Sequence, residues 1–191
     1  MRIGPRHTND VTSICLNTHP LKWLQELKYL GINLLSAKRF TFNLQVFKHK
    51  YCCALNSIFG KIGVSSSPAV LCSLINSFCV PILMYAVESL NWTQKQLKSL
   101  DNAYSHAFYK VFNTFDNHVV KQFQYYMGCL PMSLAIDVRK LQEYDKIVTG
   151  VNHPMYSLCM FVKNDFQSIC DRYNIALNDY HRPKGKHFYV M

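Results

Sequence analysis

One stretch of this chain restricts its fold more than any other: residues 69–87 contain no charged side chain over nineteen positions. Such a run is long enough either to cross a membrane or to form a helix buried on all sides in a helical domain. Ser73, Asn76 and Ser77 lower its hydropathy. Pro81 interrupts it, and the aromatic and basic flanks typical of a membrane span are missing. We therefore predict a core helix of a mainly α protein, with a single-pass membrane span through 69–87 as an alternative.

The segment that follows the first 40 residues has the apolar period of an amphipathic helix. Its apolar side chains recur every three or four positions, at Leu44, Phe47, Tyr51, Leu55, Ile58 and Ile62. Gly60 and Gly63 are expected to end this helix. Lys50 and Lys61 fall on one edge of the apolar stripe, about three turns apart and facing the same way.

Start signals predict further helices downstream. Thr93 and Gln96 have the spacing of a capping box, in which each side chain binds a backbone N–H of the other residue. Three more helices are expected, over residues 119–127, 131–148 and 154–173. Asp137, Glu143 and Asp145 alternate with basic residues on the second of these, which predicts a solvated charged face.

The first 35 residues are predicted to form short extended pieces rather than helices. Gly4 and Pro5 mark a turn near the N-terminus. The apolar run 21–35 contains Tyr29, Leu30, Gly31 and Ile32, a sequence that suits a strand whose glycine lets another backbone approach closely.

Positive charge is concentrated near the N-terminus. The chain carries a formal net charge of +10, and residues 1–61 hold nine Lys/Arg against two Asp/Glu, a net +7. A basic block of this kind attracts polyanions, nucleic acid first and acidic lipid second. Between Lys38 and Tyr51 cations alternate with aromatic residues, as in grooves where cations meet phosphates and rings stack on bases. The alternative interpretation is that the rings form the core face of the helix and the lysines its solvated edge.

The sequence shows no constellation of residues for catalysis. Two-metal nucleotidyl transfer needs clustered carboxylates, yet no two of the eleven Asp/Glu are adjacent. Glycine-rich phosphate loops and a nucleophile elbow are also missing. The eight cysteines include no Cys-x-x-Cys pair, and His49 with Cys52 and Cys53 offers a metal corner without a second pair at finger-like spacing. We expect no catalytic residue, no metal and no cofactor.

Several sequence blocks, in order, resemble the region that follows the palm in non-LTR (LINE-type) retrotransposon reverse transcriptases, which are RNA-directed DNA polymerases. The blocks span residues 1–6 (MRIGPR), 23–32 (WLQELKYLGI), 48–63 (with NSIFGKIG), 77–90 (SFCVPILMYAVESL) and 100–114. Together they extend over about two thirds of the chain. Each block is weakly specific, and their order and spacing carry the resemblance.

The resemblance implies a primer-grip-like β-hairpin whose strand pair ends in Tyr29-Leu30-Gly31, followed by a helical thumb that clamps the template–primer duplex, a further helical region and a tail. These four parts would span residues 1–35, 36–115, 116–177 and 178–191. Family position and charge together predict nucleic-acid contacts at Tyr29, Leu30, Gly31, Lys38, Arg39, Lys48, Lys50 and Lys61. The run 69–87 becomes a core helix of the thumb.

The departures from the family matter equally. The Asp-Asp box and the other metal-binding Asp of the palm would precede Met1, and no zinc-knuckle-like Cys/His cluster is visible near the C-terminus. We therefore expect a piece of a reverse transcriptase, from a decayed element or one exon of a longer product. It would not be an enzyme by itself.

The expected partner is an RNA–DNA or RNA template–primer duplex, bound without sequence preference. No small-molecule substrate and no membrane are expected, and the chain could associate with a palm domain or with itself. The polar, basic first thirty residues argue against a secretory signal, so an intracellular location is expected, nuclear or cytoplasmic. An alternative function is that of a small helical interaction protein derived from a retroelement, without a nucleic-acid role.

Overall fold

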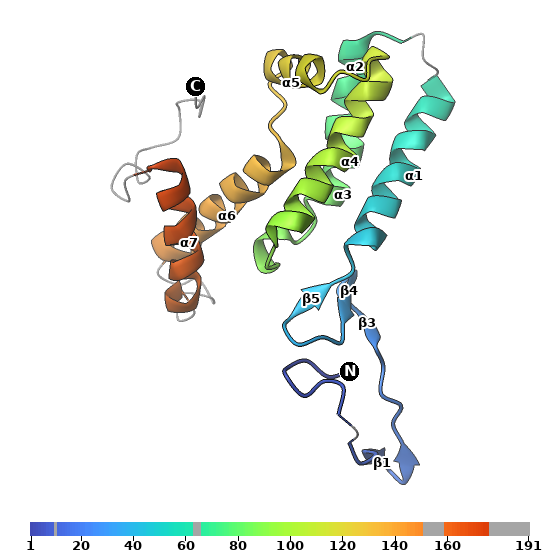
Figure 1. Cartoon of the computed structure of the whole chain (residues 1–191), viewed down its shortest axis with the longest axis vertical. Helices are drawn as coiled ribbons and strands as arrows, with labels where there is room; N and C mark the ends of the chain where they lie inside the picture. The colour runs from blue at the N-terminus through green and yellow to red at the C-terminus, as the bar shows by residue number, and fades with distance from the viewer. Residues whose placement is uncertain (10, 63–65, 151–158, 176–191) are drawn as a thin grey trace. The chain divides into compact units, whose positions relative to one another are not determined.

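The computed structural model describes residues 1–9, 11–62, 66–150 and 159–175 (Figure 1). The chain is mainly α-helical with small antiparallel sheets near the N-terminus, which confirms the predicted fold class. Contacts divide it into two compact units, Met1–Ser133 (unit 1) and Leu134–Met191 (unit 2). Each unit is described by itself.

Unit 1 begins with two small antiparallel sheets. The first pairs β1 (Cys15–Leu16) with β2 (His19–Pro20). The second has the order β3-β4-β5, with β3 at Glu26–Tyr29, β4 at Ile32–Leu35 and β5 at Thr41–Phe42. The side chain of Phe42 packs edge-to-face on Phe47 and Trp92, so this sheet joins the helical part through an aromatic cluster.

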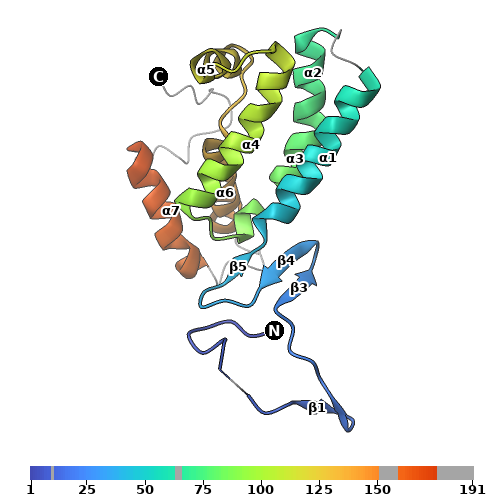
Figure 2. The same cartoon turned by 45° about the vertical axis from the view of Figure 1, so that its right-hand side comes forward.

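The helical part of unit 1 has two long helices and several short ones. Its elements are α1 (Leu44–Ile62), α2 (Pro68–Leu74), the π-helical η1 (Ile75–Cys79), α3 (Val80–Leu83), the 3-10 helix η2 (Val87–Ser89), α4 (Gln94–Phe112) and α5 (Asn117–Tyr126). Helices α1 and α4 run in the same direction, since Lys48 contacts Ser99 and Asn56 contacts Lys110. The segments α2, η1 and α3 pack against this pair (Figure 2).

The charge-free run is helical, as predicted, but it is not buried on all sides. Its segment Pro68–Ser89 is long and apolar enough to cross a membrane, and 39% of its most apolar window is buried. Leu71, Ile75, Cys79 and Leu83, spaced four apart, lie fully buried on one side. Val70, Phe78 and Tyr85 are exposed on the others. The prediction of an all-round core helix is therefore corrected to a helix with one buried face.

The helix ends show which local signals decide structure here. Gly60 lies inside α1, so the prediction that it ends the helix is wrong, and Gly63 lies outside the described residues. The capping box of Thr93 and Gln96 at the start of α4 is present in full. Asp116 caps α5 by accepting a hydrogen bond from the His118 N–H at 2.8 Å.

Unit 2 is built from α6 (Met132–Thr149) and α7 (Cys159–Tyr173). The first two residues of α6 belong to unit 1. Its core contains Leu141, Phe166 and Ile169. The predicted start of the last helix, 154–158, and the predicted tail, 178–191, lie outside the described residues.

One charge prediction for unit 2 is wrong. Asp137 does not lie on a solvated face: its side chain is buried and its Oδ2 accepts hydrogen bonds from Arg172 Nη1 at 2.6 Å and Tyr173 Oη at 2.9 Å. Glu143, six residues further along α6, is partly exposed and pairs with Lys146 at 3.1 Å, as expected of a solvated face.

Candidate nucleic-acid interface

The tip of the β3–β4 hairpin is a two-residue turn. Leu30 and Gly31 both adopt positive φ, +45° and +82°, the requirement for the hairpin turn whose twist matches the flanking strands. The sequence predicted a strand here, with a backbone approaching the glycine. Instead the tip meets a side chain: a Cβ at Gly31 would lie 3.4 Å from the Tyr85 ring, and Tyr85 Oη donates to the Leu30 carbonyl at 2.9 Å.

The side chains at this tip face solvent. Tyr29 is 61% exposed and Leu30 is 72% exposed, although the backbone beneath them is held by the turn and by Tyr85. A fixed backbone that presents apolar side chains to water is suited to contact a sugar or base surface.

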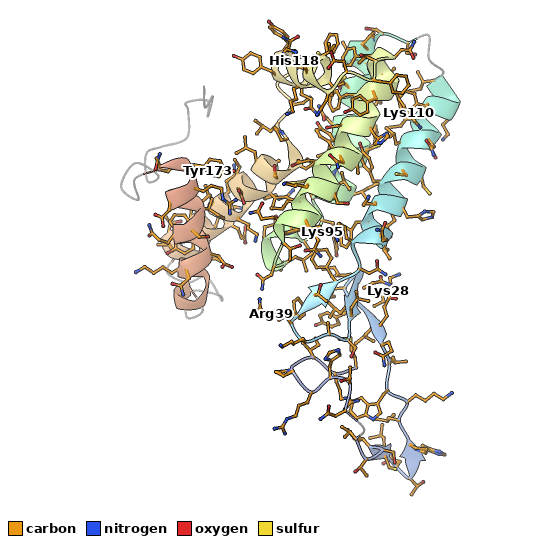
Figure 3. All side chains as sticks on the ribbon, in the orientation of Figure 1. Lys28, Arg39, Lys95, Lys110, His118 and Tyr173 are labelled. Atoms are coloured by element: carbon orange, nitrogen blue, oxygen red, sulfur yellow. The ribbon has the colours of Figure 1, made fainter. Side chains whose placement is uncertain are left out.

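Lys38 and Arg39 lie in the connection between β4 and β5, where both side chains are exposed. Figure 3 labels Arg39. Phe40 follows them and is also exposed. This connection therefore carries two cations and a ring outside the packed core of unit 1.

Helix α1 places Lys50 and Lys61 on the same exposed side. The buried residues Phe47, Tyr51 and Leu55 lie about 60° to 140° around the helix from Lys50, so the two lysines flank the buried face. Eleven residues of helical rise separate the two lysines by about 16 Å with a rotation of only about 20°. None of the ion pairs within the described residues includes either lysine, and α1 has no Asp or Glu in its sequence.

Lys48 lies apart from these two lysines. It is half-buried, about 160° around α1 from Lys50, and its Nζ donates to Ser99 Oγ of α4 at 3.1 Å. Of the three α1 lysines predicted to bind nucleic acid, the structure brings Lys50 and Lys61 onto one side and places Lys48 at the junction of two helices.

Lys110 was not among the predicted site residues, and it lies at the same junction of α1 and α4 as Lys48. Its Nζ donates to Asn56 Oδ1 of α1 at 3.0 Å and lies 5.8 Å from the centroid of the Phe59 ring. Figure 3 labels it on α4. We call the line of Lys48, Asn56, Ser99 and Lys110 the α1–α4 seam. Sequence spacing offers one signal, because Lys110 follows Ser99 by eleven residues and so faces the same way.

Three carboxylates of unit 1 accept hydrogen bonds, and one of them, Glu26, does so at the start of α1 through Asn43. Glu26 Oε1 accepts hydrogen bonds from the side chains of Asn33 and Asn43. Asp101 accepts the Ser133 N–H at 2.9 Å, and Asp116 caps α5. Unit 1 contains thirteen Lys/Arg against five Asp/Glu in its sequence, a net +8. Unit 1 as a whole is therefore positively charged, and α1 contributes only cations to that balance.

The possible metal corner remains a two-residue contact. His49 Nε2 and Cys53 Sγ lie 3.6 Å apart on one turn of α1. Across the part of the chain that the structure describes, no group of three or more His, Cys, Asp or Glu side chains is placed to hold a metal ion.

Comparison with models of protein families, with curated proteins and with solved structures found no match to this chain.

Proposed function

We propose that this chain is part of a non-LTR retrotransposon reverse transcriptase and that its own activity is sequence-independent binding of an RNA–DNA or RNA duplex. The observation that carries the proposal is the exposed side of α1, where Lys50 and Lys61 face the same way on a helix without carboxylates. The order of the sequence blocks supports the choice of family. No polymerisation is proposed for this chain.

The spacing of the two lysines fits a nucleic-acid strand. Their separation of about 16 Å is short enough for both ammonium groups to contact the backbone of one duplex. Each lysine that neutralises a phosphate releases condensed counterions, which favours binding at low salt. The α1–α4 seam adds Lys110 on a neighbouring helix, and the hairpin tip adds exposed Tyr29 and Leu30.

The proposal is tested by titrating a labelled RNA–DNA hybrid with the whole chain at several salt concentrations. We expect binding that weakens as salt rises, because the contacts are to phosphates. The Lys50→Glu/Lys61→Glu variant is expected to bind at least about tenfold more weakly, with a salt slope smaller by about two.

A matched variant separates local contacts from net charge. Lys146→Glu/Lys163→Glu changes the net charge by the same amount at two exposed lysines of unit 2. It is expected to bind about as tightly as the unaltered chain, and circular dichroism establishes that each variant is folded. Equal losses in the two double variants, or no binding at low salt by a folded chain, would overturn the proposal.

A second candidate function is a protein-interaction role without nucleic acid, and one observation favours it. Every described residue from 11 to 30 is exposed, including the apolar side chains Ile14, Leu16, Leu21, Leu24 and Leu27. Contiguous exposed apolar surface marks binding sites for a protein partner, such as a palm domain, or for a second copy. Sedimentation of the chain without nucleic acid tests this, since concentration-dependent self-association favours the second function.

A further inference from the structure

The solvent side of α5 has an unusual composition. Its exposed residues after the first position are His118, Lys121, Gln122, Tyr125 and Tyr126. The two tyrosines are 70% and 81% exposed. We call these five residues the α5 face. It consists of two phenol rings, one imidazole ring, one lysine ammonium group and one amide. It contains no aliphatic side chain and no carboxylate.

The rings of the α5 face stand on a well-packed helix. Phe123 stacks on Phe112 of α4 with centroids 3.9 Å apart and an interplanar angle of 6°. Val120 and Gln124 are buried beneath. Tyr125 and Tyr126 meet edge-to-face with centroids 5.7 Å apart. Because the helix is anchored from its inner side, the two rings are presented to solvent at little further entropic cost.

The charges on this face suit a phosphate backbone. Lys121 precedes Tyr125 by four residues, so the ammonium group and the ring lie on the same side one turn apart. Asp116, the nearest carboxylate in sequence, is occupied by capping the helix at the His118 N–H. A cation beside rings that lack a competing carboxylate is the arrangement that binds single strands, in which bases stack and phosphates meet the cation.

We propose that the α5 face binds unpaired nucleotides of a nucleic-acid strand, with Tyr125 and Tyr126 stacking on bases and Lys121 contacting phosphate. The proposal rests on the proposed function for its choice of ligand and deepens it. Helix α5 follows α4 at the end of the helical part away from the β3–β4 hairpin (Figures 1 and 2). A strand that leaves a duplex bound along α1 and α4 in that direction would reach this face.

The face is less suited to a lipid surface or to a protein groove. Helices that lie in a membrane interface bury Leu, Phe or Trp side chains. The α5 face itself has none of these, although exposed Phe115, Met127 and Leu130 flank it. Single-stranded nucleic acid offers bases that stack on the tyrosine rings and phosphates that contact Lys121.

The test compares two forms of one labelled RNA–DNA hybrid, blunt and with a single-stranded extension of about eight nucleotides, a length within the usual site size of such binders. The unaltered chain is expected to bind the extended form about tenfold more tightly, since each stacked base contributes substantially. Tyr125→Ala/Tyr126→Ala is expected to lose that gain and to bind the blunt hybrid normally.

Two controls separate stacking from other effects. Tyr125→Phe/Tyr126→Phe keeps the rings and should keep the gain. Phe78→Ala removes another exposed ring, 63% exposed on η1, and should leave the gain unchanged. The inference is overturned if the extension gives no gain, if the double alanine variant retains it, or if Phe78→Ala abolishes it equally.

A third titration, with single-stranded oligouridine alone, separates this inference from the proposed function. If oligouridine binds in a way that depends on Tyr125 and Tyr126 while the blunt hybrid does not bind, the inference about the α5 face is supported. The same result overturns the proposal of duplex binding. Binding of phosphatidylserine vesicles that depends on Tyr125 and Tyr126, with no binding of oligouridine, would show instead that the face is a membrane contact.

Discussion

The hydroxyl group of Tyr85 donates a hydrogen bond of 2.9 Å to the main-chain carbonyl of Leu30, fifty-five residues earlier in the chain. This bond joins the end of the charge-free helical run to the tip of the β3–β4 hairpin. The Tyr85 ring also covers Gly31, with which Leu30 forms the turn. The exposed hairpin tip is therefore held at a defined position against the helical part of unit 1.

Tyr85→Phe is expected to loosen the hairpin tip without unfolding unit 1. The variant keeps the ring against Gly31 and removes the hydrogen bond, which contributes about 0.5–1 kcal/mol at a half-exposed site. Hydrogen exchange of the amides of Tyr29 and Ile32 should become severalfold faster. Tyr29→Phe, at an exposed ring, should leave exchange unchanged, and similar acceleration in both variants would show that the Tyr85 bond does not hold the tip.

Two glycine substitutions are expected to act in opposite directions. Gly31→Ala should lower the free energy of unfolding by about 1 kcal/mol or more, because a residue with a side chain is strained at φ +82° and its Cβ would contact the Tyr85 ring. Gly60→Ala should raise it by about 0.5–1 kcal/mol, because Gly60 lies inside α1 with open space at its Cβ position. Urea denaturation midpoints measure both changes, and a gain for Gly31→Ala would contradict the turn geometry.

Two buried tyrosines are expected to respond differently to loss of the hydroxyl group. Tyr51 Oη is buried without a hydrogen-bond partner in the described structure, whereas Tyr104 Oη donates to Asn76 Oδ1 at 3.2 Å. Tyr51→Phe should leave stability unchanged or raise it by about 1 kcal/mol, since it removes an unsatisfied buried group. Tyr104→Phe should cost about 1 kcal/mol. Chemical denaturation of the two variants in parallel measures both changes in the free energy of unfolding. An equal loss in both variants would contradict the difference in hydrogen bonding between the two hydroxyl groups.

Asp137 is expected to matter most for unit 2. Asp137→Ala should destabilise unit 2 by about 2–3 kcal/mol, because it removes the shared acceptor of Arg172 and Tyr173 from a buried position. Glu143→Ala, which breaks the exposed pair with Lys146, should cost less than about 1 kcal/mol. Limited proteolysis with mapping of the cut sites to α6 and α7 compares the two variants. Equal resistance of both variants to cleavage would show that the buried Asp137 contacts do not stabilise unit 2.

Stability is expected to fall at alkaline pH through Cys72. Burial, with the nearby Cys129 as the smaller cause, raises the pKa of the Cys72 thiol from 9.0 to about 11. Between pH 9 and about pH 11, the Cys72 thiol loses its proton in the unfolded chain and keeps it in the folded chain. The free energy of unfolding therefore falls as pH rises through that window and is unaffected by this group below it.

The check is urea denaturation at about pH 8, 9.5 and 10.5. Cys72→Ala should reduce the alkaline slope, whereas Cys52→Ala, at an exposed thiol, should not. Some slope should remain in Cys72→Ala, since burial also raises the pKa of Cys79 and of Tyr51. An unchanged slope would show that Cys72 ionises as readily in the folded chain as in the unfolded one.

Features that depend on a few neighbouring residues were predictable from the sequence. The apolar period from Leu44 placed α1, and the capping box of Thr93 and Gln96 placed the start of α4. The hairpin was expected from the family resemblance alone. Local signals did not place its turn at Leu30 and Gly31, because a leucine with positive φ is uncommon and the usual turn signal, Asn or Asp before glycine, is missing. What stabilises that leucine lies far away, at Tyr85.

Pairings between distant elements were beyond sequence reasoning. Lys110 joins the α1–α4 seam only because α4 lies parallel to α1, and local patterns do not specify which helices become neighbours. Asp137 has the sequence context of a surface residue, but α7 places Arg172 and Tyr173 over it. The two exposed lysines, Lys50 and Lys61, needed only the helical period.

The π-helical segment Ile75–Cys79 sets the rotational phase of everything that follows it in the run. A π turn accommodates one residue more than an α turn, which spares the chain the clash that Pro81 would otherwise make with the preceding turn. Residues four apart drift around an uninterrupted α-helix by about 40° at each step. Because the π turn takes up one extra residue, Leu71, Ile75, Cys79 and Leu83 stay on one buried side of the run although they are spaced four apart.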